Sequence, residues 1–102
     1  HDELDLAFGC IRIKQSGGHA GHNGLRSISS RLGGGDYPRV RIGVGRPPHG
    51  GDVTGHVLGA FSSAEKANLE AVVERACEAV EMVLCDGVVA AMNSVNGQSP
   101  VC

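Results

Sequence analysis

The sequence predicts one α/β domain in which a β-sheet is covered by helices. Two short segments, 10–14 and 38–44, alternate apolar and charged residues with the period of two that half-buried strands show. A longer segment, 62–84, carries apolar residues at helical spacing and is expected to cover that sheet. The chain has 102 residues, which is enough for one compact domain with a core of its own.

Both predicted strands have an apolar face and a cationic face. The apolar positions are Ile11, Ile13, Val40, Ile42 and Val44. The cationic positions that alternate with them are Arg12, Lys14, Arg39 and Arg41. Because residues two apart on a strand share a face, each strand is expected to bury its aliphatic side chains and to present its basic ones to solvent or to a ligand.

The first predicted helix, 24–32, lies between the two strands. Asn23 is its expected N-cap, because the side-chain oxygen of asparagine accepts hydrogen bonds from the first helical N–H groups. Its apolar stripe is formed by Leu25, Ile28 and Leu32. The three glycines at 33–35 are expected to end this helix.

The longest predicted helix opens with a capping box formed by Ser62 and Glu65. Its apolar stripe comprises Leu69, Val72, Val73, Ala76, Val80 and Val83. Before it, the pattern of 53–61 fits either a short helix or a lid segment. After it, 88–95 is expected to add one or two helical turns, and 97–102 is expected to be a frayed tail.

Composition excludes some functions and favours others. With two Phe, one Tyr and no Trp, the chain does not support a platform that stacks nucleic-acid bases on aromatic rows. No apolar run approaches the roughly 20 residues that span a bilayer, so no membrane partner is expected. The formal net charge is −2, yet 12–46 holds seven of the nine basic residues against one acid, a balance of +6. A polyanion bound to this segment is favoured over the alternative of an ordinary solvated surface.

The four cysteines show no C-x-x-C spacing. Cys77 and Cys85 are eight residues apart on one predicted helix, which is too far for a disulfide between them. Buried thiols in a reducing compartment are therefore expected.

The segment 15–27, QSGGHAGHNGLRS, concentrates glycines and polar side chains where the first strand leads into the first helix. It matches neither glycine-rich phosphate-loop pattern, and His19 and His22 lack the further ligands of a zinc site. Glycines such as Gly18 and Gly21 let the backbone approach a ligand closely, and a helix N-terminus presents free N–H groups. A solvent-exposed His22 and a merely capping Asn23 are the alternative, but the block as a whole favours a binding site.

At this point the motifs become specific. KQSGGHAGHNGLRSI, preceded by HDELDL and followed by RVRIGVGRPP, resembles the bacterial-type peptidyl-tRNA hydrolase family over nearly the whole chain up to Asn96. The resemblance implies a mixed β-sheet wrapped by helices and an enzyme that recycles stalled peptidyl-tRNA by hydrolysing the ester between the peptide and the 3′ ribose. It further implies tRNA as partner, no metal or other cofactor, and a monomer.

The resemblance also implies roles for single residues. Asp2 matches the acid that hydrogen-bonds the catalytic His, and His22 and Asn23 match a polar pair at the substrate channel, flanked by the loop glycines Gly18 and Gly21. The cations expected to meet tRNA phosphates are Arg12, Lys14 and Arg41. The family's general base lies on a motif of the form N-P-x-x-x-x-x-x-R-H-N, which this sequence does not contain.

Because the sequence starts at His1 and lacks that motif, we expect 1–102 to be the C-terminal portion of a single hydrolase-like domain. Alone, it is expected to bind tRNA weakly and to be catalytically inactive, in the cytoplasm or in an organellar matrix. The alternative is a non-catalytic RNA-binding module of the kind that assists organellar splicing. A catalytic His in the sequence upstream of His1 would support the enzyme, and its replacement there would support the RNA-binding module.

Overall fold

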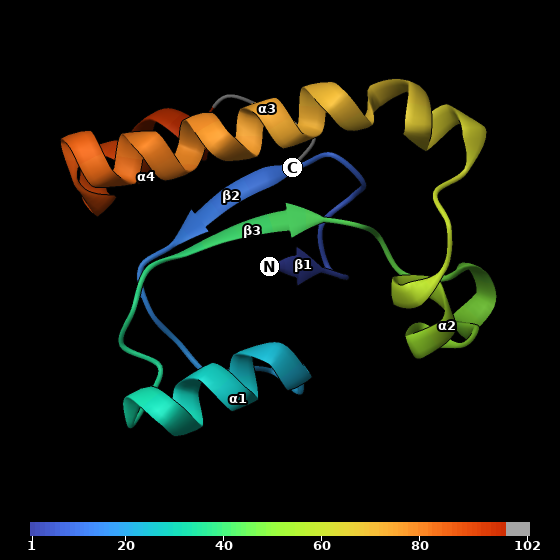
Figure 1. The fold of residues 1–102 in the computed structure, drawn as a ribbon, viewed down its shortest axis with the longest axis horizontal. Helices are drawn as coiled ribbons and strands as arrows, with labels where there is room; N and C mark the ends of the chain where they lie inside the picture. The colour runs from blue at the N-terminus through green and yellow to red at the C-terminus, as the bar shows by residue number, and fades with distance from the viewer. Residues whose placement is uncertain (98–102) are drawn as a thin grey trace.

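The structure, a computed structural model, describes residues 1–97 and consists of a small sheet between helices (Figure 1). The strands are β1 (Asp2–Glu3), β2 (Ile11–Lys14) and β3 (Arg39–Gly43). The helices are α1 (Asn23–Leu32), the 3-10 helix η1 (Pro48–Gly50), α2 (Val53–Leu58), α3 (Ser63–Asp86) and α4 (Val88–Val95). The predicted strands β2 and β3 and the predicted helices α1, α3 and α4 are confirmed in their order, and the segment before α3 is a short helix. β1 and η1 were not predicted from the sequence.

The sheet is mixed, with strand order β1-β3-β2. β2 runs antiparallel to β3 and pairs Arg12 with Arg41, whereas β1 runs parallel to β3 and pairs Asp2 with Ile42. The chain terminus extends this parallel pairing, because the amino group of His1 donates to the carbonyl of Val40 at 2.9 Å. A mixed sheet covered by helices is therefore confirmed.

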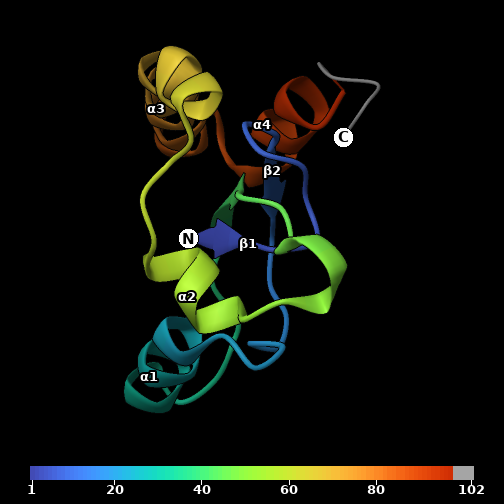
Figure 2. The ribbon, with the colours of Figure 1, turned by 90° about the vertical axis from the view of Figure 1, so that its right-hand side faces the viewer.

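The core lies between the sheet and the two C-terminal helices. α3 and α4 pack on one side of the sheet, while α1 and α2 lie on the other side (Figures 1 and 2). The buried cluster comprises Ile11, Ile13, Val72, Ala76, Ala79, Ala91 and Val95. α3 starts as predicted, because Ser62 Oγ accepts from the Glu65 N–H at 3.1 Å and the Glu65 carboxylate accepts from the Ser62 N–H at 2.9 Å.

On both α1 and α3, only some of the apolar residues that were predicted to face the core are buried. On α1 only Leu25 is buried, and Ile28 and Leu32 are 47% and 66% exposed. On α3 the side chains of Val73 and Val80 are 54% and 45% exposed. They line an apolar groove of about 790 Å³ beside β3, because no element among residues 1–97 covers that side of the helix.

The outer border of β2 is closed by a single side chain. The carboxamide of Asn96 accepts from the Ile13 N–H at 2.7 Å and donates to the Ile13 carbonyl at 3.0 Å. These are the two hydrogen bonds that a further strand would make, so Asn96 satisfies the backbone groups of Ile13 on the side of β2 where residues 1–97 provide no strand. The rest of the expected frayed tail, 98–102, lies outside the described residues.

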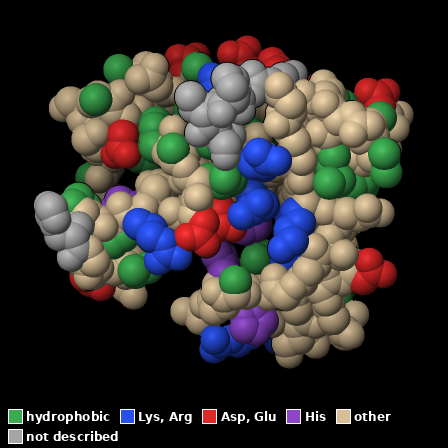
Figure 3. Space-filling model, turned by 180° about the vertical axis from the view of Figure 1, so that it is seen from behind, with side chains coloured by type: hydrophobic (Ala, Val, Ile, Leu, Met, Phe, Trp, Pro, Cys, Tyr) green, Lys and Arg blue, Asp and Glu red, His purple; other side chains and the backbone are tan. Residues whose placement is uncertain are grey.

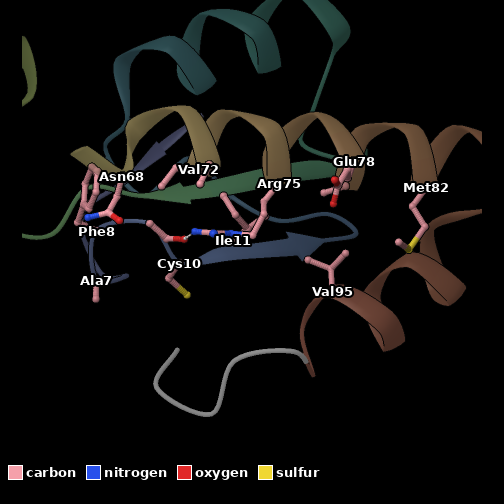
Figure 4. Close-up of a pocket in the computed structure, with 13 residues that line it drawn as sticks. Ala7, Phe8, Cys10, Ile11, Asn68, Val72, Arg75, Glu78, Met82 and Val95 are labelled. Atoms are coloured by element: carbon pink, nitrogen blue, oxygen red, sulfur yellow. Dashed lines mark hydrogen bonds between the residues drawn. The ribbon is translucent and has the colours of Figure 1, made fainter. Parts of the chain in front are cut away.

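A cavity of about 560 Å³ separates α3 from the loop that leads into β2 (Figure 4). Arg75 reaches across it and donates to the carbonyl of Gly9 at 3.1 Å. Val95 of α4 and Met82 of α3 line the same cavity (Figure 4). It therefore lies among the helices of the core side, away from the polar loop at the start of α1.

Two further predictions meet different outcomes. Cys77 and Cys85 are free thiols as expected, but both are exposed, so their predicted burial is wrong. Cys10 is buried and its sulfur is disulfide-bonded, so the prediction of a thiol there is wrong as well, and Cys102 lies outside the described residues. None of the described helices has the length and apolarity to cross a membrane.

Candidate functional site

A cavity of about 390 Å³, lined by charged and polar side chains and by apolar side chains of α2, lies on the side of the sheet opposite the core. Its walls come from β1, the glycine-rich loop 15–21, the start of α1, the basic residues of β3 and the helix α2. Seen from behind, basic, acidic and histidine side chains gather around a hollow in this part of the surface (Figure 3). We call this the site cavity.

His22 is the N-cap of α1, one residue earlier than predicted. Its Nδ1 accepts from the N–H of Leu25 at 3.1 Å, and its backbone is extended with φ −71° and ψ 116°. The prediction that Asn23 caps the helix is therefore wrong, and Asn23 is instead the first helical residue. The unprotonated Nδ1 of the imidazole accepts this bond in place of an amide oxygen, and because histidine is not among the usual N-cap residues the local sequence pointed to Asn23.

The second ring nitrogen of His22 faces Asp2. Nε2 lies 2.8 Å from Oδ1 of the Asp2 carboxylate. Because Nδ1 accepts from a backbone N–H, the proton of the neutral ring is on Nε2, which donates to Asp2. The ring of His1 packs edge-on against that of His22, with 5.1 Å between the ring centroids. Both nitrogens of His22 are thus occupied, and its orientation is fixed.

Asn23 presents an exposed side chain to the site cavity. Among residues 1–97 its carboxamide makes no hydrogen bond, so both its oxygen and its amino group are available to a ligand. Gly18 and Gly21 line the same cavity. Gly21 has φ +81°, a left-handed conformation that favours glycine, and it turns the chain into the cap of α1.

The predicted phosphate-binding cations divide into three environments. Arg41 donates from Nε and Nη2 to one oxygen of Glu3 at 3.1 and 3.0 Å, so its charge is partly neutralised. Lys14 is exposed, lies against Gly17 and lines the site cavity together with Arg41. Arg12 is half-buried opposite Arg41 on the same face of the sheet, but it does not line the cavity.

Two residues and one strand near the site were not predicted as parts of it. Arg39, predicted to belong to the exposed cationic face, is 6% exposed and hydrogen-bonds the backbone of the glycine-rich loop. His56 Nε2 lies 3.1 and 3.0 Å from the carbonyls of Val44 and Gly45 and so fastens α2 at the cavity. The first strand had no signal at all, because two residues cannot show a period. These contacts join segments that are distant in the sequence, so no local sequence pattern predicts them.

No group of three or more His, Cys, Asp or Glu side chains among the described residues could hold a metal ion. The chemistry of the site cavity is that of hydrogen bonding and charge. It offers a carboxylate that orients an imidazole, a carboxamide without a hydrogen-bond partner among residues 1–97, a glycine-rich backbone and nearby cations. This set suits an extended polar substrate that carries negative charge at one end.

Fold and site together define an α/β domain with a cavity at a glycine-rich strand-to-helix junction, lined by charged, polar and apolar side chains. The chain belongs to the peptidyl-tRNA hydrolase family, whose model, described as Peptidyl-tRNA hydrolase, matches residues 1–101. The predicted resemblance is therefore confirmed.

Curated relatives and solved structures agree with this assignment. The peptidyl-tRNA hydrolase of Rhodococcus jostii is 56% identical over 96 residues, which are 94% of this chain and 50% of the relative. That of Syntrophotalea carbinolica is 55% identical over 98 residues, 96% of this chain and 51% of the relative. The crystal structure of the Acinetobacter baumannii peptidyl-tRNA hydrolase matches with a TM-score of 0.82 at 42% identity, over 98% of this chain and 50% of that one. The chain thus spans about half the length of the relatives it matches.

Proposed function

We propose that this chain supplies the substrate-binding part of a peptidyl-tRNA hydrolase site, in which the ester of an N-acyl-aminoacyl-tRNA is hydrolysed to free tRNA and peptide. The observation that carries the proposal is one cavity lined by Asp2, His22 and Asn23 together with Lys14 and Arg41. An acyl ester and the phosphates next to it would meet these two sets of groups side by side. The family to which the chain belongs supports this substrate.

In this proposal Asp2 orients the general base. Hydrolysis of an ester by water needs a base within hydrogen-bond reach of that water. His22 does not fill this role in the observed arrangement, because its Nδ1 lone pair accepts from Leu25 and its Nε2–H faces Asp2. The second oxygen of Asp2, Oδ2, makes no hydrogen bond within 1–97. It is therefore available to a further imidazole, which it would hold in one tautomer while stabilising the imidazolium that forms.

Asn23 would bind the acyl part of the substrate. A carboxamide offers an acceptor and two donors, which suits either the main chain of the peptide or the attacking water. The helix N-terminus adds N–H groups and positive potential where negative charge develops on the ester oxygen. Lys14, Arg41 and Arg12 would contact the phosphates of the tRNA end, and these contacts would position the ester without reading sequence.

A hybrid enzyme tests the proposal. The unmatched half of the Rhodococcus jostii relative is joined to residues 1–102 and assayed with an N-acetylated aminoacyl-tRNA. We expect hydrolysis by the hybrid, and a loss of about 10²-fold for Asn23→Ala, because a misplaced substrate costs on that order. Asn93→Ala, an exposed asparagine of α4, is the matched control. A folded Asn23→Ala hybrid with the activity of the control would contradict the proposed role.

The 102 residues alone provide the second arm. We expect them to bind tRNA weakly and to hydrolyse negligibly, since the motif that carries the family's general base is not among them. Three phosphate contacts would give a slope of about −2 to −3 for log affinity against log salt. A tRNA affinity that does not change with salt would contradict the phosphate-binding part of the proposal. Hydrolysis by the 102 residues at a rate near that of the hybrid would contradict the proposal that they lack the general base.

A further inference from the structure

Arg39 is a buried cation without an ion-pair partner among residues 1–97. Its Nη1 donates to the carbonyl of Gly18 at 2.6 Å, and its Nη2 donates to those of Gly17 and Gly35, the latter at 3.0 Å. The guanidinium carbon lies 4.6 Å from the centroid of the Tyr37 ring. Hydrogen bonds from a charged donor are stronger than neutral ones, so this cluster is a firm attachment point for backbone.

The backbone that Arg39 holds flanks α1 on both sides. Gly17 and Gly18 belong to the glycine-rich loop before the helix, and Gly35 belongs to the turn after it. The two segments also bond directly, because the Gly17 N–H donates to the Gly35 carbonyl at 3.1 Å. A single side chain on β3 therefore ties the entrance and the exit of α1 to the sheet.

Apolar packing contributes little to the position of α1. Leu25 is its one buried residue. Two side-chain hydrogen bonds join the helix and its cap to other segments: His22 to Asp2, and Ser29 Oγ to the Tyr37 hydroxyl at 3.0 Å. Figure 1 shows the helix standing apart from the sheet, below β3.

We propose that Arg39 is a positioning residue of the site cavity, which sets where the N-terminus of α1 stands and so holds His22 against Asp2. The inference rests on the proposed function, because the cavity it arranges is the proposed substrate site. Arg39 does not itself need to touch substrate. It acts through the carbonyls of Gly17 and Gly18, which lie five and four residues before the cap His22.

Lysine cannot replace arginine in this role. The three acceptors are spread over two loops, and the planar fork of the guanidinium reaches them with two nitrogens at once. A lysine ammonium is a single point of attachment on a flexible stem. It would keep the charge and lose the geometry, so Arg39→Lys separates positioning from electrostatics.

The test uses the 102-residue protein and NMR. In the native chain we expect the ¹⁵N signals of the His22 ring to report one tautomer, protonated at Nε2. In Arg39→Lys and Arg39→Gln we expect this pattern to average between tautomers and the Gly17 and Leu25 amides to exchange at least about tenfold faster, as the loss of a charge-assisted hydrogen bond implies. The Gly43 amide, bonded to the Cys10 carbonyl within the sheet, is the internal reference and should keep its rate.

Arg31→Lys and Arg31→Gln are the matched controls, since Arg31 is exposed in the last turn of α1. They should leave the His22 pattern unchanged. If Arg39→Lys is folded and its His22 ring still shows the ¹⁵N signals of one tautomer, the inference is overturned. This holds even if Arg39→Gln unfolds, which faster exchange of the Gly43 amide would reveal. An averaged pattern in Arg39→Lys with a protected Gly43 amide supports it.

Kinetics of the hybrid enzyme separate this inference from the proposed function. If the hybrid hydrolyses the ester, Arg39→Lys should lower kcat by about 10²-fold and leave KM within a few-fold, because a displaced cap affects the reacting groups more than the tRNA contacts. An unchanged kcat would overturn the positioning role. If the native hybrid does not hydrolyse at all, the proposed function fails while the NMR result still decides the role of Arg39.

Discussion

The imidazole of His22 bridges two elements that lie far apart in the sequence: its Nε2–H donates to the carboxylate of Asp2 at 2.8 Å while its Nδ1 caps the helix that starts at Asn23. The first strand and the first helix are thereby joined through one ring. Because both nitrogens are engaged, His22 behaves as a fixed connector. This connector is the point from which the other properties of the site can be tested.

Removing the carboxylate of Asp2 should free the His22 ring. We expect Asp2→Ala to lower the free energy of unfolding by about 1 kcal/mol, below the usual value for a charged hydrogen bond because the side chains of His22 and Asp2 are 26% and 35% exposed. Urea unfolding gives this number, and the ¹⁵N signals of His22 should show mixed tautomers. Asp36→Ala, an exposed acid with no described hydrogen bond, serves as reference. Equal losses in both variants would show that the Asp2–His22 bond contributes nothing.

Gly35 should not tolerate a side chain. A Cβ at this position would overlap the Gly17 carbonyl oxygen and approach Nη2 of Arg39, so the two loops around α1 would have to separate. We expect Gly35→Ala to cost about 1–3 kcal/mol in urea unfolding. Gly18→Ala is the control, because a Cβ there meets nothing within 4 Å, and its cost should stay within about 0.5 kcal/mol. A reversed order of the two costs would be incompatible with the close approach of the loops.

Glu3 should restrain Arg41 from binding phosphate. Glu3→Gln removes the carboxylate that accepts two hydrogen bonds from the Arg41 guanidinium. We expect tRNA affinity to rise and the log–log salt slope to steepen by up to about 0.9, one additional phosphate contact. Glu70→Gln on the exposed side of α3 removes the same charge elsewhere. If both variants change the affinity equally, the effect is one of net charge and not of Arg41.

The start of α3 should depend on its capping box. Ser62→Ala removes the acceptor of the Glu65 N–H, and we expect the free energy of unfolding to fall by about 1 kcal/mol. The neighbouring substitution Ser63→Ala lies inside the helix and should stay within about 0.5 kcal/mol. Thermal or urea denaturation followed by circular dichroism measures both. A larger loss of stability in Ser63→Ala than in Ser62→Ala would show that Ser62 is not the residue that caps the helix.

The parts of the fold that the sequence predicted are those that local chemistry determines. Alternation gave β2 and β3, and the Ser62–Glu65 pair gave the start of α3 within a residue. The resemblance then identified the family, and the structure brings Asp2, His22, Asn23, Lys14 and Arg41 to one cavity. Each of these features can be traced to a short motif.

The parts that escaped prediction depend on contacts between distant segments. β1 is too short to carry a period, and it is a strand because β3 offers it a partner. Arg39 and Arg41 are two apart on the same strand and were both expected on its exposed face, yet Arg39 is buried and donates to backbone carbonyls of the loops around α1. Val73 belongs to a helical apolar stripe, but which side of that stripe is buried is decided by the extent of the sheet.

The carboxamide of Asn96, near the end of the described residues, protects part of the edge of the sheet. One amide group, held at the end of α4, takes the place of a whole neighbouring strand along Ile13. A truncated protein that lacks Asn96 would expose the backbone N–H and C=O groups of Ile13 at the edge of β2. We expect such a protein to aggregate through pairing of exposed strand edges at temperatures at which its helices are still folded.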